Sequence, residues 1–236
     1  MRYELYYWTG IQGRGEFVRL ALEDAGASYV DVAREKGDGV MAAFLEGEHE
    51  GAPPFAPPFL KAGRLVIAQT ANILQYLGPR LGLVSDSESG RIYAHQLELT
   101  ISDIVAEVHD SHHPVAGGLY YADQKAEAKR RAADLRRTRL PKFLGYFEHV
   151  LQRGGGRHPL RRHSYVDLSL FQLMSGLDYA FPRAMRRLSP KLPQLTTLRQ
   201  RVAQRPNIAA YLQSPRRLAF NEDGIFRHYP ELDDPA

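Results

Sequence analysis

The segment that decides the fold is YELYYWTGIQGRGEFVRLALEDAGASYVDV, residues 3–32. Residues 3–8 are aromatic and β-prone, which predicts a strand. Apolar residues then recur at helical spacing over residues 16–25, and Gly26 predicts the end of that helix. Residues 29–32 predict a second strand. A β-α-β unit of this kind is expected to be parallel and right-handed.

The next part completes a small α/β unit. Residues 36–58 are irregular, with one short apolar piece that suggests a short helix and two Pro-Pro pairs. Residues 59–60 and 65–67 lie on either side of a turn at residues 61–64 and predict a hairpin. Residues 69–77 predict a helix that ends at Gly78-Pro79. The order is therefore β-α-β-α-β-β-α.

The remainder carries almost no strand pattern. A segment rich in Gly, Ser and Asp, residues 82–89, predicts a linker. Helices are expected over residues 91–110, 124–151, 165–181 and 194–204. We therefore expect two domains, an α/β domain over residues 1–81 and an all-helical domain over residues 90–236.

The composition excludes several classes of protein. The 236 residues include no cysteine, which excludes disulfides, Cys-ligated zinc, iron–sulfur clusters and a thiol nucleophile of the protein's own. A net charge of +4 is only weak support for nucleic-acid binding. No apolar run approaches the roughly 20 residues of a membrane span, and the charged residues 1–4 do not resemble a signal peptide. We expect a soluble cytoplasmic protein with neither a nucleic-acid nor a membrane partner.

Three motifs occur in an order that resembles one family. They are Leu5-Tyr6-Tyr7-Trp8 with Gly13-Arg14-Gly15-Glu16, then Pro58 with Gln69-Thr70 eleven residues further on, then Ser164-Tyr165-Val166-Asp167. Together they resemble the soluble glutathione S-transferases, in a tyrosine-type (alpha-, mu-, pi- or sigma-like) member of bacterial appearance. The resemblance implies a thioredoxin-like first domain that binds glutathione and a helical second domain that forms the hydrophobic-substrate pocket.

The resemblance makes Tyr7 the catalytic residue. A thiol with a pKa of about 8.5 is only a few per cent ionised at pH 7, and a phenol O–H donated to the sulfur stabilises the thiolate. Lowering that pKa by about two units requires roughly 2.7 kcal/mol, which one charge-assisted hydrogen bond and a helix N-terminus can supply. The alternative is a packed core tyrosine, a role we expect instead for Tyr6 on the opposite face of the strand. An extra residue before Gly13, relative to the family, leaves Thr9 as a competing hydroxyl donor.

Further residues are assigned to glutathione binding by the resemblance. Gln69 and Thr70 open a helix whose free N–H groups suit the γ-glutamyl carboxylate, although Thr70 could simply cap that helix. By the resemblance, Asp103 corresponds to an acid that in some classes reaches across a dimer to the γ-glutamyl amine. The alternative is that Asp103 is an ordinary solvated acid on its helix. Arg14 either organises the site or lies on the surface.

A cis-proline is also implied, at the edge where the cysteinyl part of glutathione pairs like a short strand. If Pro58 is that residue, Pro57 precedes it and has no N–H to donate. One backbone hydrogen bond to glutathione, worth about 0.5–1.5 kcal/mol, would then be lost. The alternative is that Pro57 is the cis-proline and Ala56 supplies the pair. The spacing to Gln69 favours the first arrangement.

Two other features of the sequence concern a helix cap and a cluster of histidines. Ser164 and Asp167 predict a reciprocal capping box at a helix start. His109, His112 and His113, with Asp110, fit no common zinc motif, so no metal is expected.

The predicted second-substrate pocket contains Trp8, Ile11, His113 and Phe220. Aromatic residues in 220–226 either fold over that pocket as a lid or pack on the first domain.

We expect a homodimeric detoxification enzyme that activates the thiol of glutathione for attack on small hydrophobic electrophiles. Glutathione is the co-substrate, with no other cofactor. The alternatives are a non-catalytic binding or carrier protein of the same fold, and a glutathione-dependent isomerase or peroxidase.

Overall fold

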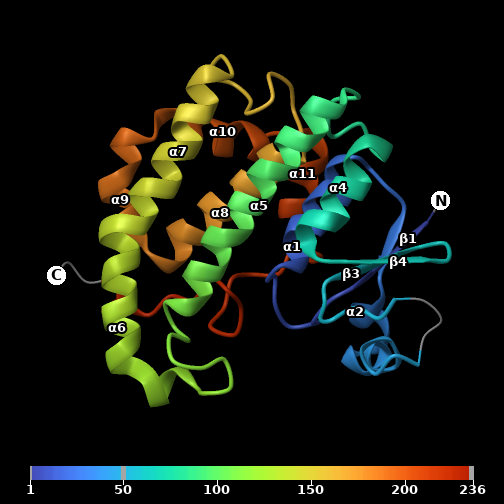
Figure 1. The fold of residues 1–236 in the computed structure, drawn as a ribbon, viewed down its shortest axis with the longest axis horizontal. Coiled ribbons are helices and arrows are strands. Elements are labelled where there is room, and N and C mark those ends of the chain that lie inside the picture. Colours follow the sequence, from blue (N-terminus) through green and yellow to red (C-terminus); the bar gives the residue numbers. More distant parts are fainter. Residues whose placement is uncertain (1, 49–51, 234–236) are drawn as a thin grey trace.

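The computed structural model describes residues 2–48 and 52–233, which form an α/β domain beside a helical domain (Figure 1). In the described residues the sheet has four strands in the order β2-β1-β3-β4. β1 runs parallel to β2 and antiparallel to β3, and β3 forms a hairpin with β4. The strands are β1 (Tyr3–Tyr6), β2 (Tyr29–Asp31), β3 (Phe59–Ala62) and β4 (Leu65–Ala68). The predicted β-α-β unit and hairpin are confirmed.

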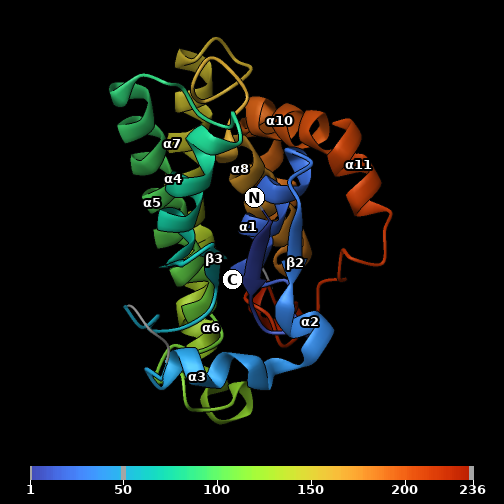
Figure 2. The same cartoon turned by 90° about the vertical axis from the view of Figure 1, so that its right-hand side faces the viewer.

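The two faces of the sheet are covered by different helices, because successive side chains of a strand point to opposite faces. Leu5 and Leu60 are fully buried in a cluster with Val18 of α1 (Gly15–Asp24) and Ile73 of α4 (Thr70–Arg80). Tyr6 and Phe59 belong to a second cluster, with Phe44, on the other face. That face carries α2 (Val32–Lys36), a 3-10 turn (Asp38–Met41) and α3 (Ala42–Leu45), seen at the bottom of Figure 2.

The helical domain is organised around α8 (Tyr165–Ala180), most of whose residues are buried. α8 packs against α5, α9, α10 and also α1, so one helix joins the cores of the two domains (Figure 2). The other helices of this domain are α5 (Glu88–Asp110), α6 (Lys125–Asp134), α7 (Leu140–Arg153), α9 (Pro182–Leu188), α10 (Pro193–Ala203) and α11 (Pro206–Leu212). Short 3-10 turns lie at Tyr121–Gln124, Ser189–Lys191 and Pro230–Leu232. Within the described ranges, no helix is both long and apolar enough to cross a membrane.

The capping box at the start of α8 is confirmed. The Asp167 carboxylate accepts the Ser164 N–H at 3.0 Å, and the Ser164 side chain accepts from the backbone of the third helical residue. The preceding residue, His163, bonds the Asp24 carboxylate at 2.9 Å, so this corner also ties α8 to the end of α1. The helix start is therefore fixed by polar contacts on both sides.

Several predicted boundaries were wrong. α4 does not stop at Gly78-Pro79 but continues to Arg80. A proline in the last turn removes only one intrahelical hydrogen bond. The Leu81 N–H still donates to the Leu77 carbonyl at 2.9 Å. Gly78 is required for packing instead, since a Cβ there would lie 2.7 Å from the Tyr165 ring.

Other segments differ as well. The strands of the hairpin are longer than expected and leave only residues 63–64 for the turn. The helix predicted over residues 124–151 is divided by a π-helical segment, Leu135–Arg139, which marks the junction of α6 and α7. α9 and α11 were not predicted, because each is a single seven-residue segment that begins with proline.

Candidate active site

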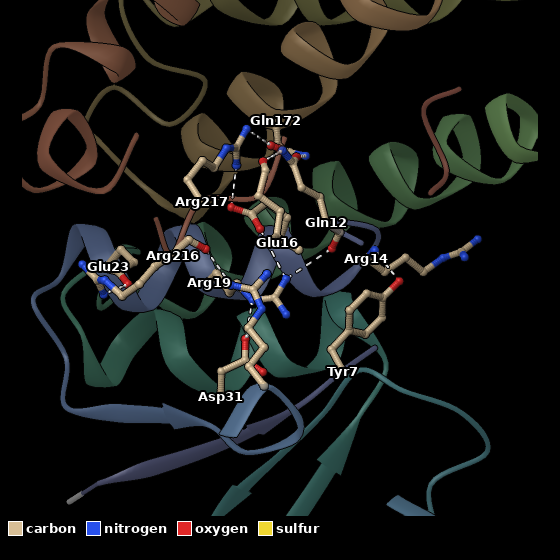
Figure 3. A network of polar contacts seen from close by, with 12 residues as sticks. Tyr7, Gln12, Arg14, Glu16, Arg19, Glu23, Asp31, Gln172, Arg216 and Arg217 are labelled. Atoms are coloured by element: carbon tan, nitrogen blue, oxygen red, sulfur yellow. Dashed lines mark hydrogen bonds and ion pairs between the residues drawn. The ribbon is translucent and has the colours of Figure 1, made fainter. Parts of the chain in front are cut away.

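Tyr7 lies just beyond the end of β1, and its side chain points toward Arg14 at the start of α1 (Figure 3). Tyr6 stacks on Phe59 with ring centroids 4.6 Å apart, so it is the core residue of the pair, as predicted. The Tyr7 ring is 4% exposed and rests on glycine backbone. A Cβ at Gly13 would approach the Tyr7 hydroxyl to 2.0 Å, and one at Gly15 would approach its Cγ to 2.5 Å. Both glycines are therefore needed for the ring to lie where it does.

The hydroxyl of Tyr7 is held by the backbone at the start of α1. The Arg14 N–H donates to the Tyr7 oxygen at 2.8 Å (Figure 3). Burial raises the pKa of Tyr7, and the Arg14 N–H with the charges of Arg14 and Arg19 offsets that rise in part. The phenol consequently keeps its proton at neutral pH. Because the Arg14 amide occupies an acceptor position of the oxygen, the phenolic O–H is free to be donated to a ligand.

The competing donor, Thr9, is directed elsewhere. Its N–H donates to Asp38 at 3.1 Å and its hydroxyl lies 3.5 Å from the other oxygen of that carboxylate. Thr9 therefore faces the 3-10 turn, and Tyr7 is the hydroxyl beside α1.

A buried polar network fixes the start of α1 and joins the domains (Figure 3). Arg19 is fully buried, with its guanidinium 2.7 Å from the Asp31 carboxylate and 3.3 Å from that of Glu16. Glu16 in turn accepts the Tyr211 hydroxyl at 2.6 Å and pairs with Arg217. Charges buried in this way are tolerated because each is paired and hydrogen-bonded.

The network also reaches the loop that precedes α1. The side chain of Gln12 accepts from Gln172 of α8 at 2.8 Å and donates to the Leu218 carbonyl. Residues from α8 and from the C-terminal segment therefore hold the loop that carries Gly13 and Arg14. The position of the Tyr7 hydroxyl depends on contacts that cross the domain boundary.

A cavity of about 290 Å³ lies between α1, α4 and α5, and one of its lining residues is Arg14, whose N–H bonds the Tyr7 hydroxyl. Three residues predicted for glutathione binding, Arg14, Gln69 and Thr70, line it together. Gln69 has a φ of 68°, which is uncommon for a residue other than glycine, and it places the first turn of α4 against the cavity. Thr70 does not cap the helix with its side chain, because its hydroxyl has no hydrogen-bond partner among the described residues. That hydroxyl is available to a ligand.

The other residues predicted to bind glutathione do not line this cavity. The cis peptide bond is Pro57-Pro58, the arrangement that the spacing to Gln69 favoured. Pro58 is buried immediately before β3. Asp103 is exposed on α5 and does not line the cavity, whereas its neighbour Ser102 does.

The residues predicted for a second-substrate pocket are dispersed. Trp8 is 40% exposed, His113 stacks on His109 at 4.9 Å, and Phe220 stacks on Tyr179 at 5.1 Å. Phe220 lines a space of only about 10 Å³ to which Trp8, Ile11 and His113 do not contribute.

The C-terminal segment fills this region with its own side chains. Phe226 lies against Gly176 of α8, where a Cβ would be 2.4 Å from its ring, and the Ile225 carbonyl bonds His112 at 2.8 Å. Burial lowers the pKa of His112 to about 3, so its ring is neutral and bonds that carbonyl through an N–H. Asn221 donates to the Gly10 carbonyl, so the segment also touches the loop of the α/β domain.

One group of residues in the described ranges could hold a metal ion, His158, His163 and Asp167. Each already has a partner in the protein: His158 bonds Asp167 at 2.7 Å, and His163 bonds Asp24. Arg201, 3.8 Å from Asp167, adds positive charge to the cluster. The group is accounted for as an ion-pair network that closes the start of α8 on α1.

The α5 wall of the cavity was not predicted from the sequence. This wall contains His95, Glu98, Leu99 and Ser102. Counted from His95, the other three residues follow at three, four and seven positions, a spacing that places all of them on one face of a helix. This pattern was present in the sequence. Polar residues on a helix face are ordinarily solvated, so the pattern by itself does not indicate a cavity.

This geometry defines a class of protein: a small α/β domain with a hydroxyl beside a helix start, joined to a helical domain, with a cavity between α1, α4 and α5. Comparison with known proteins shows which family the chain resembles. Residues 109–215 match the family described as "Glutathione S-transferase, C-terminal domain". This part of the helical domain is therefore similar to the C-terminal domain of glutathione S-transferases.

Curated relatives extend the similarity to most of the chain. The chain is 24% identical over 216 residues to a glutathione S-transferase of Plasmodium falciparum, covering 88% of this chain and 93% of the relative. It is 27% identical over 212 residues to glutathione S-transferase P 10 of Caenorhabditis elegans, covering 89% and 90%. These relatives come from eukaryotes and lend no support to a bacterial appearance.

Solved structures show the same fold. A Pi-class glutathione S-transferase of Onchocerca volvulus matches with a TM-score of 0.69 and 24% identity, covering 90% of this chain and 93% of that one. Prostaglandin synthase D of Nilaparvata lugens matches with a TM-score of 0.72 and 17% identity, covering 91% and 98%. The fold is thus the thioredoxin-like domain plus helical domain of the glutathione S-transferases, as the sequence predicted.

Proposed function

We propose that this chain is a glutathione transferase of the tyrosine type, with Tyr7 as the group that activates the thiol of glutathione. The observation that carries the proposal is the Tyr7 hydroxyl, which keeps its proton and accepts at 2.8 Å the N–H of Arg14, a residue that lines the cavity. The similarity to glutathione S-transferases over most of the chain supports the same reaction class.

In this proposal, the γ-glutamyl carboxylate of glutathione binds at the first turn of α4, where Gln69 and Thr70 line the cavity and backbone N–H groups lack intrahelical partners. The sulfur lies at the Tyr7 hydroxyl. Pro57 supplies a carbonyl but no N–H to the cysteinyl part, so one backbone hydrogen bond is missing there.

The chemistry is a nucleophilic attack by sulfur. The thiol releases its proton to solvent, and the O–H of Tyr7 donates to the resulting thiolate and lowers its pKa. The thiolate then forms a carbon–sulfur bond with a small hydrophobic electrophile. In a substitution the leaving group departs with its bonding electron pair, and in an addition the adjacent carbon takes a proton from water.

The experiment is retention on immobilised glutathione, followed by conjugation of a chlorodinitroarene with the wild type and the Tyr7→Phe variant. We expect retention of both proteins and loss of most turnover in the variant, with a nearly unchanged affinity for glutathione. Retention without any conjugation by the wild type would favour a carrier protein of the same fold. Failure to bind glutathione would refute the proposal.

The proposal extends to organisation. Residues 1–81 would be the glutathione-binding domain and residues 90–236 the domain that contacts the electrophile, in a cytoplasmic homodimer. Asp103 is exposed on α5, so it could contact glutathione only in a second copy of the chain. Light scattering on the purified protein tests the dimer directly.

A further inference from the structure

Two glutamine side chains connect the helical domain to the loop that carries Gly13 and Arg14 (Figure 3). Gln172 lies in the middle of α8 and is fully buried, and Gln12 lies just before α1 and is almost as well buried. The side-chain nitrogen of Gln172 donates to the side-chain oxygen of Gln12 at 2.8 Å. A buried amide needs a partner for its oxygen as well as for its nitrogen, so this contact must be part of a longer chain of hydrogen bonds.

The direction of that chain is fixed at both ends. The Arg217 guanidinium, which can only donate, donates to the side-chain oxygen of Gln172 at 2.9 Å. At the other end the Leu218 carbonyl, which can only accept, receives a hydrogen bond from the side-chain nitrogen of Gln12. Each amide therefore has a single orientation that satisfies both of its neighbours. A side chain that cannot both accept and donate interrupts the chain at that point.

The backbone of Gln12 continues the connection to α1. Its carbonyl accepts the Glu16 N–H at 3.1 Å, at the start of the helical hydrogen-bond pattern, and it also accepts from Arg19 at 3.4 Å. Gln12 is thus held by its side chain in the helical domain and by its carbonyl on α1. Its position decides where the next two residues, Gly13 and Arg14, lie.

Those two residues contact the Tyr7 hydroxyl directly. The Arg14 N–H donates to the phenolic oxygen at 2.8 Å. Gly13, with a φ of 46°, lies so close that a Cβ on it would be 2.0 Å from the same oxygen. A hydrogen bond weakens when its distance and angle change, and closely packed atoms transmit a displacement rather than absorb it. A small movement of Gln12 is therefore passed on to the Tyr7 hydroxyl.

We propose that Gln172 is a positioning residue for Tyr7: acting through Gln12, it fixes the direction in which the phenolic O–H is donated to the sulfur. The inference rests on the function proposed above, in which that sulfur belongs to glutathione. It gives a residue of the helical domain that does not line the cavity part of the control over thiol activation.

The test replaces Gln172 with methionine, which keeps the length of the side chain but has no N–H to donate to Gln12. Because the charge of the protein is unchanged, a shift in thiol acidity reports the position of the Tyr7 hydroxyl and not an added electric field. In Gln172→Met we expect the pKa of the thiol of bound glutathione to rise by about one unit. The acid limb of the pH profile of kcat/KM should move with it, so that kcat/KM below that pKa falls about tenfold.

Two controls separate positioning from a loss of stability. Gln124 is another buried glutamine, and its side chain bonds the backbone of a different loop, at residues 115, 116 and 119. Gln124→Met should therefore lower the free energy of unfolding without moving the pKa of the bound thiol. In the Tyr7→Phe background, Gln172→Met should cause no further rise in that pKa, because its effect passes through the Tyr7 hydroxyl.

The results separate this inference from the proposed function. If the thiol bound to the wild type is acidic but Gln172→Met leaves its pKa unchanged, raises it no more than Gln124→Met does, or raises it equally in the Tyr7→Phe background, the inference is overturned while the proposed function stands. If Gln172→Met does not fold, Gln12→Met interrupts the same hydrogen bonds from the loop and carries the same expectations. If the thiol bound to the wild type titrates like that of free glutathione, both fail.

Discussion

The pH dependence of stability offers a sharp test, because Glu98 is buried and has no ion-pair partner among the residues that the structure describes. Its pKa is about 8 in the folded protein, against 4.5 for the ordinary group. The folded state therefore binds more protons than the unfolded state between these values, and stability must fall as the pH rises through this window. At about 1.4 kcal/mol per pH unit, the full window corresponds to a loss on the order of 5 kcal/mol from this one side chain.

The Glu98→Gln variant removes the titration and keeps the shape of the side chain. Urea unfolding of wild type and variant at pH 5 and pH 8, without ligand, isolates the contribution of Glu98 because the other groups titrate in both proteins. We expect the variant to gain several kcal/mol on the wild type between the two pH values. Parallel changes in the two proteins would refute the assignment of a neutral, unpaired carboxyl.

Three further variants test other parts of the structure. Gly15→Ala places a Cβ 2.5 Å from Tyr7 Cγ, so turnover should fall at least tenfold. The free energy of unfolding should fall by about 1–3 kcal/mol, although alanine favours the helix. Unchanged steady-state kinetics would contradict this packing of Tyr7 on Gly15. Ser164→Ala removes the cap of α8 and should cost about 1 kcal/mol in urea unfolding with unchanged kcat. Glu16→Gln leaves Arg19 less compensated in the core and should cost about 3–5 kcal/mol; a loss under 1 kcal/mol would show that the pair contributes little.

The α/β fold was predictable because its signals are local. The aromatic strand at residues 3–8, the amphipathic helix that follows and the apolar hairpin each carry their own pattern, and the capping box needs only Ser164 and Asp167. Helix ends were less predictable. Pro79 is tolerated in the last turn of α4, and Gly78 is required by the ring of Tyr165 from the other domain.

The site was only partly predictable. Arg14, Gln69 and Thr70, which the sequence assigned to one site, line one cavity, and their contact with glutathione stays a prediction. Glu98 was missed because an acid on a long helix is normally solvated, and it is buried here only by the packing of α8 and α4. The dispersal of Trp8 and Phe220 could not be foreseen either, because it depends on how the C-terminal segment packs in three dimensions.

The most direct measurement is the pKa of the thiol of glutathione bound to this protein, followed by the ultraviolet absorbance of the thiolate across a pH titration. With the Tyr7 hydroxyl donating to sulfur, that pKa should lie about two units below the value of about 8.5 for a free thiol, and Tyr7→Phe should return it most of the way. A bound thiol that titrates like the free one in the wild type, or equally low in the variant, would contradict the account.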